Sequence, residues 1–198
     1  MAGDKFIESS YEKALIALFR ELGYTYECGY DVERDYREPF YREVLEASLK
    51  RLNKGVSADI LAEGLKMVTN LNEGTLIQDN RCFTEMLQNG FAVPYLENGE
   101  GRTATLRLVD FEQPLANDFR IVNQWSVEEL GKIRCDMVVM INGLPLVVVE
   151  LKTASDENVT IEDAYLQIRN YMKKCPSLFG YNAFSVISDL AQSKAGTI

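Results

Sequence analysis

Two apolar runs joined by a tight turn dominate the chain, at residues 133–152 (IRCDMVVMINGLPLVVVELK). Each run is typical of a buried β-strand, and Asn142-Gly143 between them is a strong signal for a hairpin turn. Asp136, Glu150 and Lys152 interrupt the apolar pattern. A buried charge destabilises a fold by several kcal/mol unless it is paired or bound to a metal ion. We therefore expect a functional site in this hairpin.

The rest of the pattern predicts helices on either side of further strands. Apolar residues at helical spacing predict helices over 6–22, 41–53, 57–69, 77–89 and 160–174, the last with Thr160 as its N-cap and Pro176 beyond its end. Apolar runs or alternation predict strands over 24–30, 105–111, 120–128 and 182–189. The polar stretches 97–102 and 153–159 are expected to be loops, and the tail 191–198 an exit from the domain.

This order of elements predicts an α/β fold, in which a mixed β-sheet is flanked by helices. We expect a single domain over residues 1–198, with a helical insertion at about 41–90 and a core at about 103–190. The insertion carries no motif with recognisable chemistry, and it would shape or cover the site or bind a partner.

The turn decides whether Asp136 and Glu150 share a face of the sheet. A two-residue turn at Asn142-Gly143 places Asp136 opposite Val149, and the two carboxylates then point to opposite faces because side chains alternate along a strand. A three-residue loop or a β-bulge instead places Asp136 opposite Glu150. Since a joint site needs both carboxylates on one face, we expect a three-residue loop or a bulge.

With that register the two carboxylates face each other, and each raises the pKa of the other unless a cation lies between them. Mg²⁺ prefers oxygen ligands, polarises a bound phosphate and lowers the pKa of an attacking water. Lys152 would orient that water or stabilise charge on the phosphate. The pattern favours a magnesium-dependent nuclease centre. The structural alternative is a buried ion pair between Lys152 and Glu150 or Asp136.

Side chains on two predicted helices could extend the site. Gln167 and Tyr171 are four residues apart and share a face of the helix after the hairpin, where they could bind phosphate or hold a catalytic group in place. Packing at the helix surface is the alternative for this pair. Glu8 and Glu12 share a face of the first helix, either as solvated surface residues or with one of them helping to hold a metal ion.

Composition narrows the possible chemistry. The chain has no histidine, which excludes His-based zinc sites, Ser-His-Asp triads and nucleases with a histidine base. The four cysteines are scattered and are expected to be reduced thiols of a cytoplasmic protein. Neither a signal peptide nor an apolar run of about 18 residues occurs, so we expect no membrane span.

The net charge of −9 is unusual for a DNA-binding protein, but the charge is uneven. Residues 1–100 contain 11 basic and 18 acidic residues, whereas residues 101–198 contain 10 and 12. The second half could therefore contact DNA locally. The chain lacks the basic surface of a tight, independent DNA binder, which suggests that another component delivers the DNA.

The segments DMVVMINGLPLVVVELK (136–152) and QIRNY (167–171) resemble the nuclease domain at the N-terminus of the R (restriction and motor) subunit of type I restriction enzymes. That family has a PD-(D/E)xK nuclease core followed by a QxxxY motif. Asp136, Glu150 and Lys152 match its catalytic residues, and Gln167 and Tyr171 match QxxxY. The resemblance extends over nearly the whole chain through the flanking stretches LGYTYECG, LVDFEQPLANDF and NAFSVISD.

One position departs from the motif, because Cys135 stands where the family has the proline of "PD". The proline is not a chemical group of the site, so this departure leaves the expected chemistry unchanged.

The resemblance implies a restriction-endonuclease-like core with Mg²⁺ held by Asp136, Glu150 and, in the first helix, Glu12. It implies cleavage of unmodified foreign double-stranded DNA in the bacterial cytoplasm, with methylation and specificity subunits as partners and an ATP-driven motor. The chain has no GxxxxGK[ST] phosphate loop. ATP would therefore act only through motor domains absent from this chain. The chain would supply the nuclease portion alone, either as a part of a longer subunit or as a short gene product.

Two other functions compete with this one. The chain could be a nuclease-fold module that assembles with partners or binds DNA without cutting it, although the intact Asp136, Glu150 and Lys152 set favours cleavage. It could also be a stand-alone nuclease of a repair system or mobile element, which its low basic content disfavours.

Overall fold

A six-stranded mixed β-sheet forms the centre of the molecule, with strand order β1-β4-β5-β6-β7-β8. The computed structural model describes residues 2–152, 161–189 and 192–198. The strands are β1 Thr25–Cys28, β4 Phe119–Glu128, β5 Lys132–Ile141, β6 Leu144–Leu151, β7 Phe184–Ser188 and β8 Ser193–Gly196. Pairing is antiparallel for β4–β5, β5–β6 and β7–β8, and parallel for β1–β4 and β6–β7. The predicted α/β fold with a mixed sheet is confirmed.

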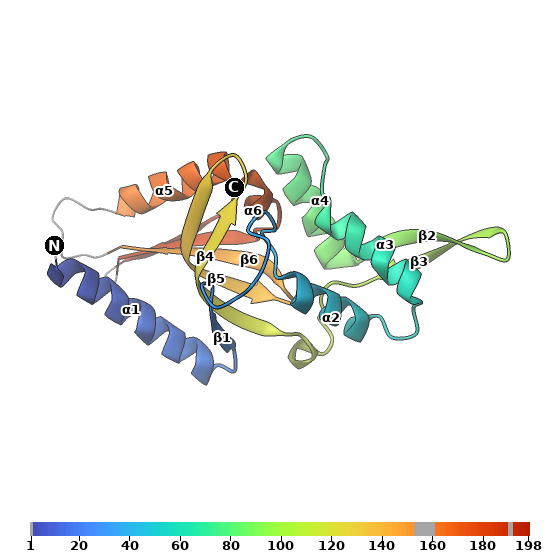
Figure 1. Cartoon of the computed structure of the whole chain (residues 1–198), viewed down its shortest axis with the longest axis horizontal. Helices are drawn as coiled ribbons and strands as arrows, with labels where there is room; N and C mark the ends of the chain where they lie inside the picture. Colours follow the sequence, from blue (N-terminus) through green and yellow to red (C-terminus); the bar gives the residue numbers. More distant parts are fainter. Residues whose placement is uncertain (1, 153–160, 190–191) are drawn as a thin grey trace.

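Helices cover both faces of this sheet (Figure 1). On one face lies α1 Ala2–Glu21, whose residue Ile16 packs against strands β4, β5 and β6 in what we call the α1-side core. On the other face lie α5 Ile161–Lys174 and the short α6 Pro176–Gly180. Ala164, Ile168 and Tyr171 of α5 pack against the same strands in what we call the α5-side core.

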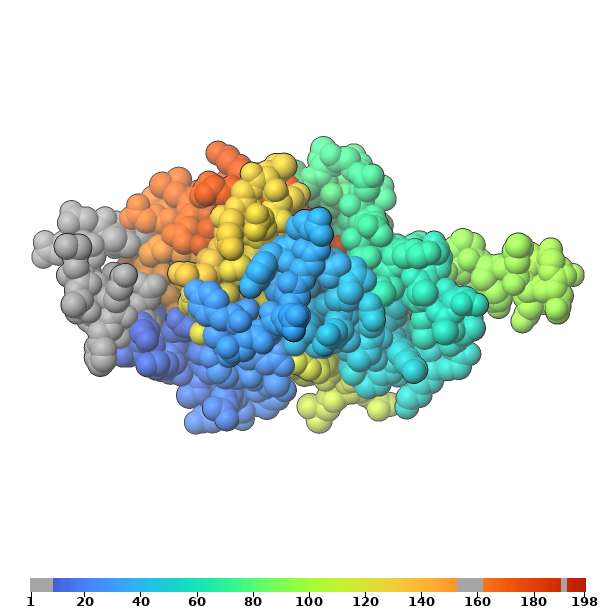
Figure 2. Space-filling model, in the orientation of Figure 1, coloured from blue at the N-terminus to red at the C-terminus, as the bar shows by residue number. Residues whose placement is uncertain are grey.

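The predicted insertion is helical and also contains a small sheet. Its elements are α2 Arg42–Leu52, α3 Ala58–Thr69, α4 Leu76–Asn89, β2 Phe91–Glu97 and β3 Glu100–Leu106. These elements share a separate apolar core that includes Leu45, Phe83 and Leu106. The insertion lies at one end of the molecule, and the tip of the β2–β3 hairpin projects from its body (Figures 1 and 2).

Strands β2, β3 and β8 differ from the sequence-based prediction, and helix α6 was not predicted. Residues 91–97 form β2, which the sequence did not indicate because Pro94 within it argues against a strand. The predicted strand over 105–111 and the predicted loop over 97–102 both have wrong bounds, since β3 begins at Glu100 and stops at Leu106. The tail forms the edge strand β8, so its prediction as an exit was wrong; Ser193–Gly196 has weak strand propensity and all four residues are exposed.

Other predicted boundaries hold or lie outside the described residues. Helix α5 ends at Lys174 as predicted, and Pro176 begins α6, where the missing N–H of a proline is tolerated. The predicted loop 153–159 and the proposed cap Thr160 fall outside the described part of the chain.

The β5–β6 hairpin combines a two-residue turn with a bulge. Asn142 and Gly143 both have positive φ, 54° and 82°, and Ile141 pairs with Leu144 across the turn. The register shifts between Val139 and Met140, after which pairing continues to Met137 opposite Val149. The expected bulge is therefore present, and it brings Asp136 level with Glu150.

The insertion holds this turn in place. Asn142 is fully buried, and its side chain bonds the Leu108 carbonyl, the Asp118 amide and Arg51 at 2.8–2.9 Å. A side chain at Gly143 would meet the backbone of α2, because an added Cβ would lie 2.6 Å from the amide nitrogen of Leu45. The insertion thus packs at the turn end of the hairpin, whereas Glu150 and Lys152 lie at the opposite end of β6.

Candidate active site

Asp136 lies where strands β5 and β6 stop pairing. The last paired residues are Met137 and Val149, and the next residue of β5 is Asp136. Its Oδ2 accepts a hydrogen bond from the backbone N–H of Leu151 at 2.8 Å. The side chain thus takes the place that a strand carbonyl would occupy. This contact fixes the Asp136 carboxylate beside the segment that carries Glu150 and Lys152.

The alternation of side chains along β5 reverses at Asp136. Ile133 and Cys135 before it lie in the α5-side core, whereas Met137 and Val139 after it lie in the α1-side core. A regular strand would keep all four odd-numbered residues on one face. Asp136 therefore sits at a break in the pleat, and its carboxylate can reach between the strands.

Strand β4 reverses at the same level. Ile121 lies in the α1-side core, but Trp125 and Val127 lie in the α5-side core. Between them Gln124 has φ of 55°, which is uncommon for a residue other than glycine. Gln124 lies opposite Asp136, since the flanking pairs are Asn123 with Met137 and Trp125 with Cys135. Sequence reasoning missed Gln124, because nothing in the local sequence demands a positive φ there.

Glu150 is buried beside Asp136, and its charge is only partly compensated. Its Oε1 accepts a hydrogen bond from Nζ of Lys152 at 2.8 Å, and its side chain is 1% exposed. Its Oε2 is buried without a hydrogen-bond partner in the described part of the chain. Burial, and secondly the Asp136 carboxylate, raise the pKa of Glu150 to about 8, although Lys152 opposes this shift. The pair therefore needs a proton or a cation to neutralise it.

The ion pair that we considered as a structural alternative is thus present, but it does not account for the whole arrangement. Lys152 uses one oxygen of Glu150, and this leaves the other oxygen and the Asp136 carboxylate in the same place. A buried ion pair that served only stability would normally have its remaining acceptor satisfied.

A chain of hydrogen bonds connects Lys152 to helix α5. Nζ of Lys152 donates to Oε1 of Gln167 at 2.8 Å, and Nε2 of Gln167 donates to the Tyr171 hydroxyl at 2.6 Å. That hydroxyl donates in turn to the backbone carbonyl of Arg134 on β5 at 2.8 Å. The predicted pair Gln167 and Tyr171 therefore contacts the predicted lysine directly, and surface packing does not describe it.

Tyr171 is a neutral donor in this chain. It is buried in the α5-side core, and burial raises the pKa of its hydroxyl above the ordinary value, with the nearby Glu150 carboxylate as the second cause. Cys135, which replaces the proline of the motif, is also buried in this core, and burial raises the pKa of its thiol. Its environment is that of a packing residue.

Glu12 approaches the sheet one strand away from Asp136. Its carboxylate accepts hydrogen bonds from the side-chain amides of Asn123 and Gln124 on β4. Among the described residues, no three acidic or cysteine side chains gather closely enough to hold a metal ion. The structure therefore does not unite Glu12 with Asp136 and Glu150, and its role as a metal ligand stays a prediction.

The residues that are united fit a hard divalent cation. Asp136 and Glu150 offer carboxylate oxygens, one of them a buried atom without a partner. Magnesium is bound by one or two carboxylates in many proteins and keeps several waters, so two protein ligands are sufficient.

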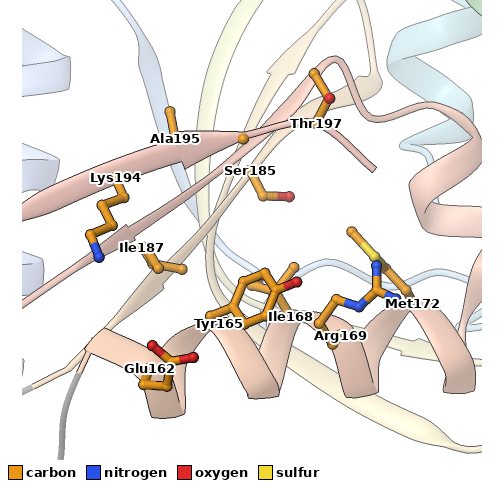
Figure 3. A pocket seen from close by; sticks show the side chains of 11 residues that line it. Glu162, Tyr165, Ile168, Arg169, Met172, Ser185, Ile187, Lys194, Ala195 and Thr197 are labelled. Atoms are coloured by element: carbon orange, nitrogen blue, oxygen red, sulfur yellow. The ribbon is translucent and has the colours of Figure 1, made fainter.

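A groove of about 370 Å³ lies on a different side of helix α5. Figure 3 shows Tyr165 and Arg169 of α5 on one side of this groove and Lys194 of β8 on the other. Neither Gln167 nor Tyr171 lines this groove. It is therefore separate from the candidate site.

The described residues contain no helix that is both long and apolar enough to cross a membrane.

Comparison with known proteins identifies the family. Residues 5–197 match the family model of the type I restriction enzyme R protein N terminus. The chain is 33% identical over 196 residues to a putative type I restriction enzyme MjaIXP endonuclease subunit of Methanocaldococcus jannaschii, covering 94% of this chain and 19% of that protein. It is 30% identical over 201 residues to the type I restriction enzyme HindI endonuclease subunit of Haemophilus influenzae, covering 96% and 19%.

A third relative, the type I restriction enzyme SsaAORF53P endonuclease subunit of Staphylococcus saprophyticus, is 38% identical over 151 residues, which cover 75% of this chain and 15% of that protein. The chain thus spans about a fifth of the length of the first two relatives. Together with the fold and the arrangement of Asp136, Glu150, Lys152, Gln167 and Tyr171, these matches place the chain in the family of type I restriction enzyme R protein N-terminal domains.

Proposed function

We propose that this chain is the magnesium-dependent endonuclease domain of a type I restriction enzyme R subunit and hydrolyses phosphodiester bonds of unmodified foreign DNA. The observation that carries the proposal is the unpartnered, buried Oε2 of Glu150 beside the anchored Asp136 carboxylate. A divalent cation would neutralise both carboxylates, whereas the proton that Glu150 holds in the metal-free protein neutralises only one of them.

Each residue has a distinct task in this proposal. Asp136 and Glu150 would hold the magnesium ion. When bound, that ion polarises the scissile phosphate and lowers the pKa of the attacking water. Lys152, whose ammonium already bonds Glu150, would orient the water or stabilise negative charge on the phosphate.

Gln167 and Tyr171 act through other groups. Gln167 accepts from the Lys152 ammonium, and Tyr171 holds Gln167 and the backbone of β5 together. Both are positioning residues, which fix the distance between the lysine and the carboxylates.

The names of the relatives suggest the wider setting. The relatives are named as endonuclease subunits of type I restriction enzymes. We infer that this domain acts with methylation and specificity subunits that select the double-stranded DNA. ATP-driven translocation by motor domains outside this chain would bring DNA to the site. The net charge of −9 supports this division, since the domain alone would hold DNA weakly.

The proposal can be tested on the chain itself with supercoiled plasmid DNA and Mg²⁺ or Mn²⁺. Lys152→Met keeps the length of the side chain and removes its charge, and we expect it to abolish nicking. Lys66→Met is the control, because Lys66 pairs with Glu63 on the exposed surface of α3. Equal nicking by wild type and Lys152→Met would contradict the assigned role. A wild-type chain that does not bind Mg²⁺ or Mn²⁺ would favour the alternative, a docking module without cleavage activity. Lack of cutting by the isolated chain alone would not, because motor domains outside this chain would bring DNA to the site.

A further inference from the structure

Two cations on the first part of β5 point away from helix α5. Ile133 and Cys135 are buried in the α5-side core, and Lys132 and Arg134, which alternate with them, are exposed. Because side chains alternate along a strand, both cations lie on the opposite side of the sheet. Arg134 is two residues from Asp136 on the same strand.

Each of these cations lies over a tyrosine from the segment between β1 and α2. The guanidinium of Arg134 is 5.9 Å from the ring centroid of Tyr30, and the ammonium of Lys132 is 5.3 Å from that of Tyr36. These distances are within the range of cation–π attraction. Tyr30 is 59% exposed. Each pair thus places a cation against a tyrosine ring near the start of β5.

Arg134 is held more firmly than an ordinary surface arginine. Its Nη1 donates to the Tyr30 hydroxyl at 2.6 Å, and its backbone carbonyl accepts from the Tyr171 hydroxyl at 2.8 Å. The second contact belongs to the hydrogen-bond chain that ends at Lys152. The backbone of Arg134 is thus tied to the candidate site through Tyr171, and its guanidinium is oriented by Tyr30.

The guanidinium charge of Arg134 is available to a ligand. Other arginines of the described chain, such as Arg42 and Arg120, lie in ion pairs with carboxylates. Within the described residues the only side-chain partner of the Arg134 guanidinium is Tyr30, a neutral group. A planar guanidinium with free donors matches the geometry of a phosphate group.

We propose that Arg134, positioned by Tyr30, binds the phosphodiester backbone of DNA near the candidate site. Because Arg134 points away from α5, whereas Lys152 contacts Gln167 of α5, Arg134 would contact a phosphate other than the scissile one. This inference rests on the proposed nuclease function and adds a substrate-binding residue to it.

The test is the affinity of the chain for a short fluorescent DNA duplex without added metal, measured by anisotropy over a series of salt concentrations. Arg134→Ala should weaken binding to all sequences alike and should reduce the slope of log K against log salt by about one, as expected for one lost phosphate contact. Arg81→Ala is the control, since it removes the same charge from an exposed arginine on helix α4.

Tyr30→Phe separates positioning from charge. It keeps the ring and removes the hydroxyl that orients Arg134, so we expect weaker binding in the wild-type background and no further loss in the Arg134→Ala background. Arg134→Lys, which keeps the charge without the planar donor group, should bind between wild type and Arg134→Ala. If Arg134→Ala fails to fold, Arg134→Lys still tests the inference.

Equal affinity and equal salt slope for Arg134→Ala and Arg81→Ala would overturn the inference. So would a wild-type chain without measurable affinity for the duplex at low salt. Neither result would by itself remove the proposed nuclease function, because metal binding at Asp136 and Glu150 is measured separately and without DNA.

Discussion

The backbone N–H of Leu151 donates a hydrogen bond to Oδ2 of Asp136 at 2.8 Å. Leu151 lies between Glu150 and Lys152, so this bond ties the first carboxylate of the candidate site to the segment that carries the other two residues. It forms because strands β5 and β6 stop pairing after Met137 and Val149. This hydrogen bond therefore belongs to the sheet as well as to the site. Mutation can separate the structural role of Asp136 from its chemical role.

Asp136→Asn should keep the fold and lose cleavage. The amide oxygen of asparagine can still accept from the Leu151 N–H, but the neutral side chain is a poor ligand for Mg²⁺. Asp136→Ala leaves that N–H without its partner and should lower the free energy of unfolding by about 1–3 kcal/mol more than Asp136→Asn does. Denaturant unfolding and plasmid nicking measure the two effects. Full cleavage by Asp136→Asn would remove this residue from the site.

Removal of the Glu150 charge should change how stability depends on pH in the metal-free protein. The folded-state pKa of Glu150 is raised to about 8, against about 4.3 in an unfolded chain. Between these values the folded state binds more protons, so this stabilising contribution is present in full below about pH 4.3 and is lost as pH rises through 8.

We therefore expect the free energy of unfolding of the metal-free wild type to fall more steeply between pH 5 and 8 than that of Glu150→Gln, as measured by denaturant titration at several pH values. Parallel pH profiles of the two proteins would show that Glu150 is not held in this way. Magnesium should flatten the profile of the wild type, because the ion replaces the proton as pH rises.

Tyr171→Phe should reduce cleavage while the protein stays folded. The change removes the hydroxyl that bonds Gln167 and the Arg134 carbonyl but keeps the buried ring. By analogy with outer-shell residues of metal sites, the expected loss of activity is about 10–100-fold. Alanine at this position is a poor test, because burial of Tyr171 in the α5-side core makes a destabilising cavity unavoidable.

Tyr181→Phe is the matched control for this experiment. Tyr181 is also buried, and its hydroxyl donates to the Val68 carbonyl at 2.8 Å, within the core of the insertion. Both variants should be destabilised by about 1–2 kcal/mol, and only Tyr171→Phe should lose activity. Unchanged nicking by a folded Tyr171→Phe protein would reduce Tyr171 to a packing residue.

Asn142→Ala should destabilise the domain through the hairpin turn. Asn98 in the β2–β3 hairpin is a close match, because it is also followed by glycine and has the same φ of 54°, but it is exposed. Asn98→Ala therefore measures the backbone contribution alone. Asn142→Ala should lower the free energy of unfolding by at least about 2 kcal/mol more, since buried partners including Asp118 and Leu108 lose their hydrogen bonds. Equal effects of both substitutions would show that the insertion does not fix the turn.

The sequence was sufficient to predict the parts of the fold that follow from local patterns. The apolar runs marked β5 and β6, and helical spacing marked α1 to α5 within a few residues. The bulge in the hairpin was predictable for a different reason. A two-residue Asn142-Gly143 turn alone would put the Asp136 and Glu150 side chains on opposite faces of the sheet. A shift in register is needed to bring the two carboxylates to the same face.

Features that depend on distant parts of the chain were not predictable in this way. The positive φ of Gln124 follows from the joint reversal of β4 and β5, which no local pattern reports. The contact between Tyr30 and Arg134 joins residues 104 positions apart, and each alone is an ordinary exposed side chain. Strand β8 forms because an edge of β7 is available, since its own residues have little preference for a strand.

The most direct test of the central claim is calorimetric titration of the chain with Mg²⁺ and Mn²⁺, together with thermal unfolding at each metal concentration. The wild type should bind the metal and gain about 2.7 kcal/mol of stability at a concentration 100-fold above the dissociation constant. Asp136→Asn should lose both effects. Asp110→Asn should retain them, because its carboxylate bonds backbone N–H groups of its own loop. An equal response of wild type and Asp136→Asn, or no response in the wild type, would contradict a metal site at Asp136 and Glu150.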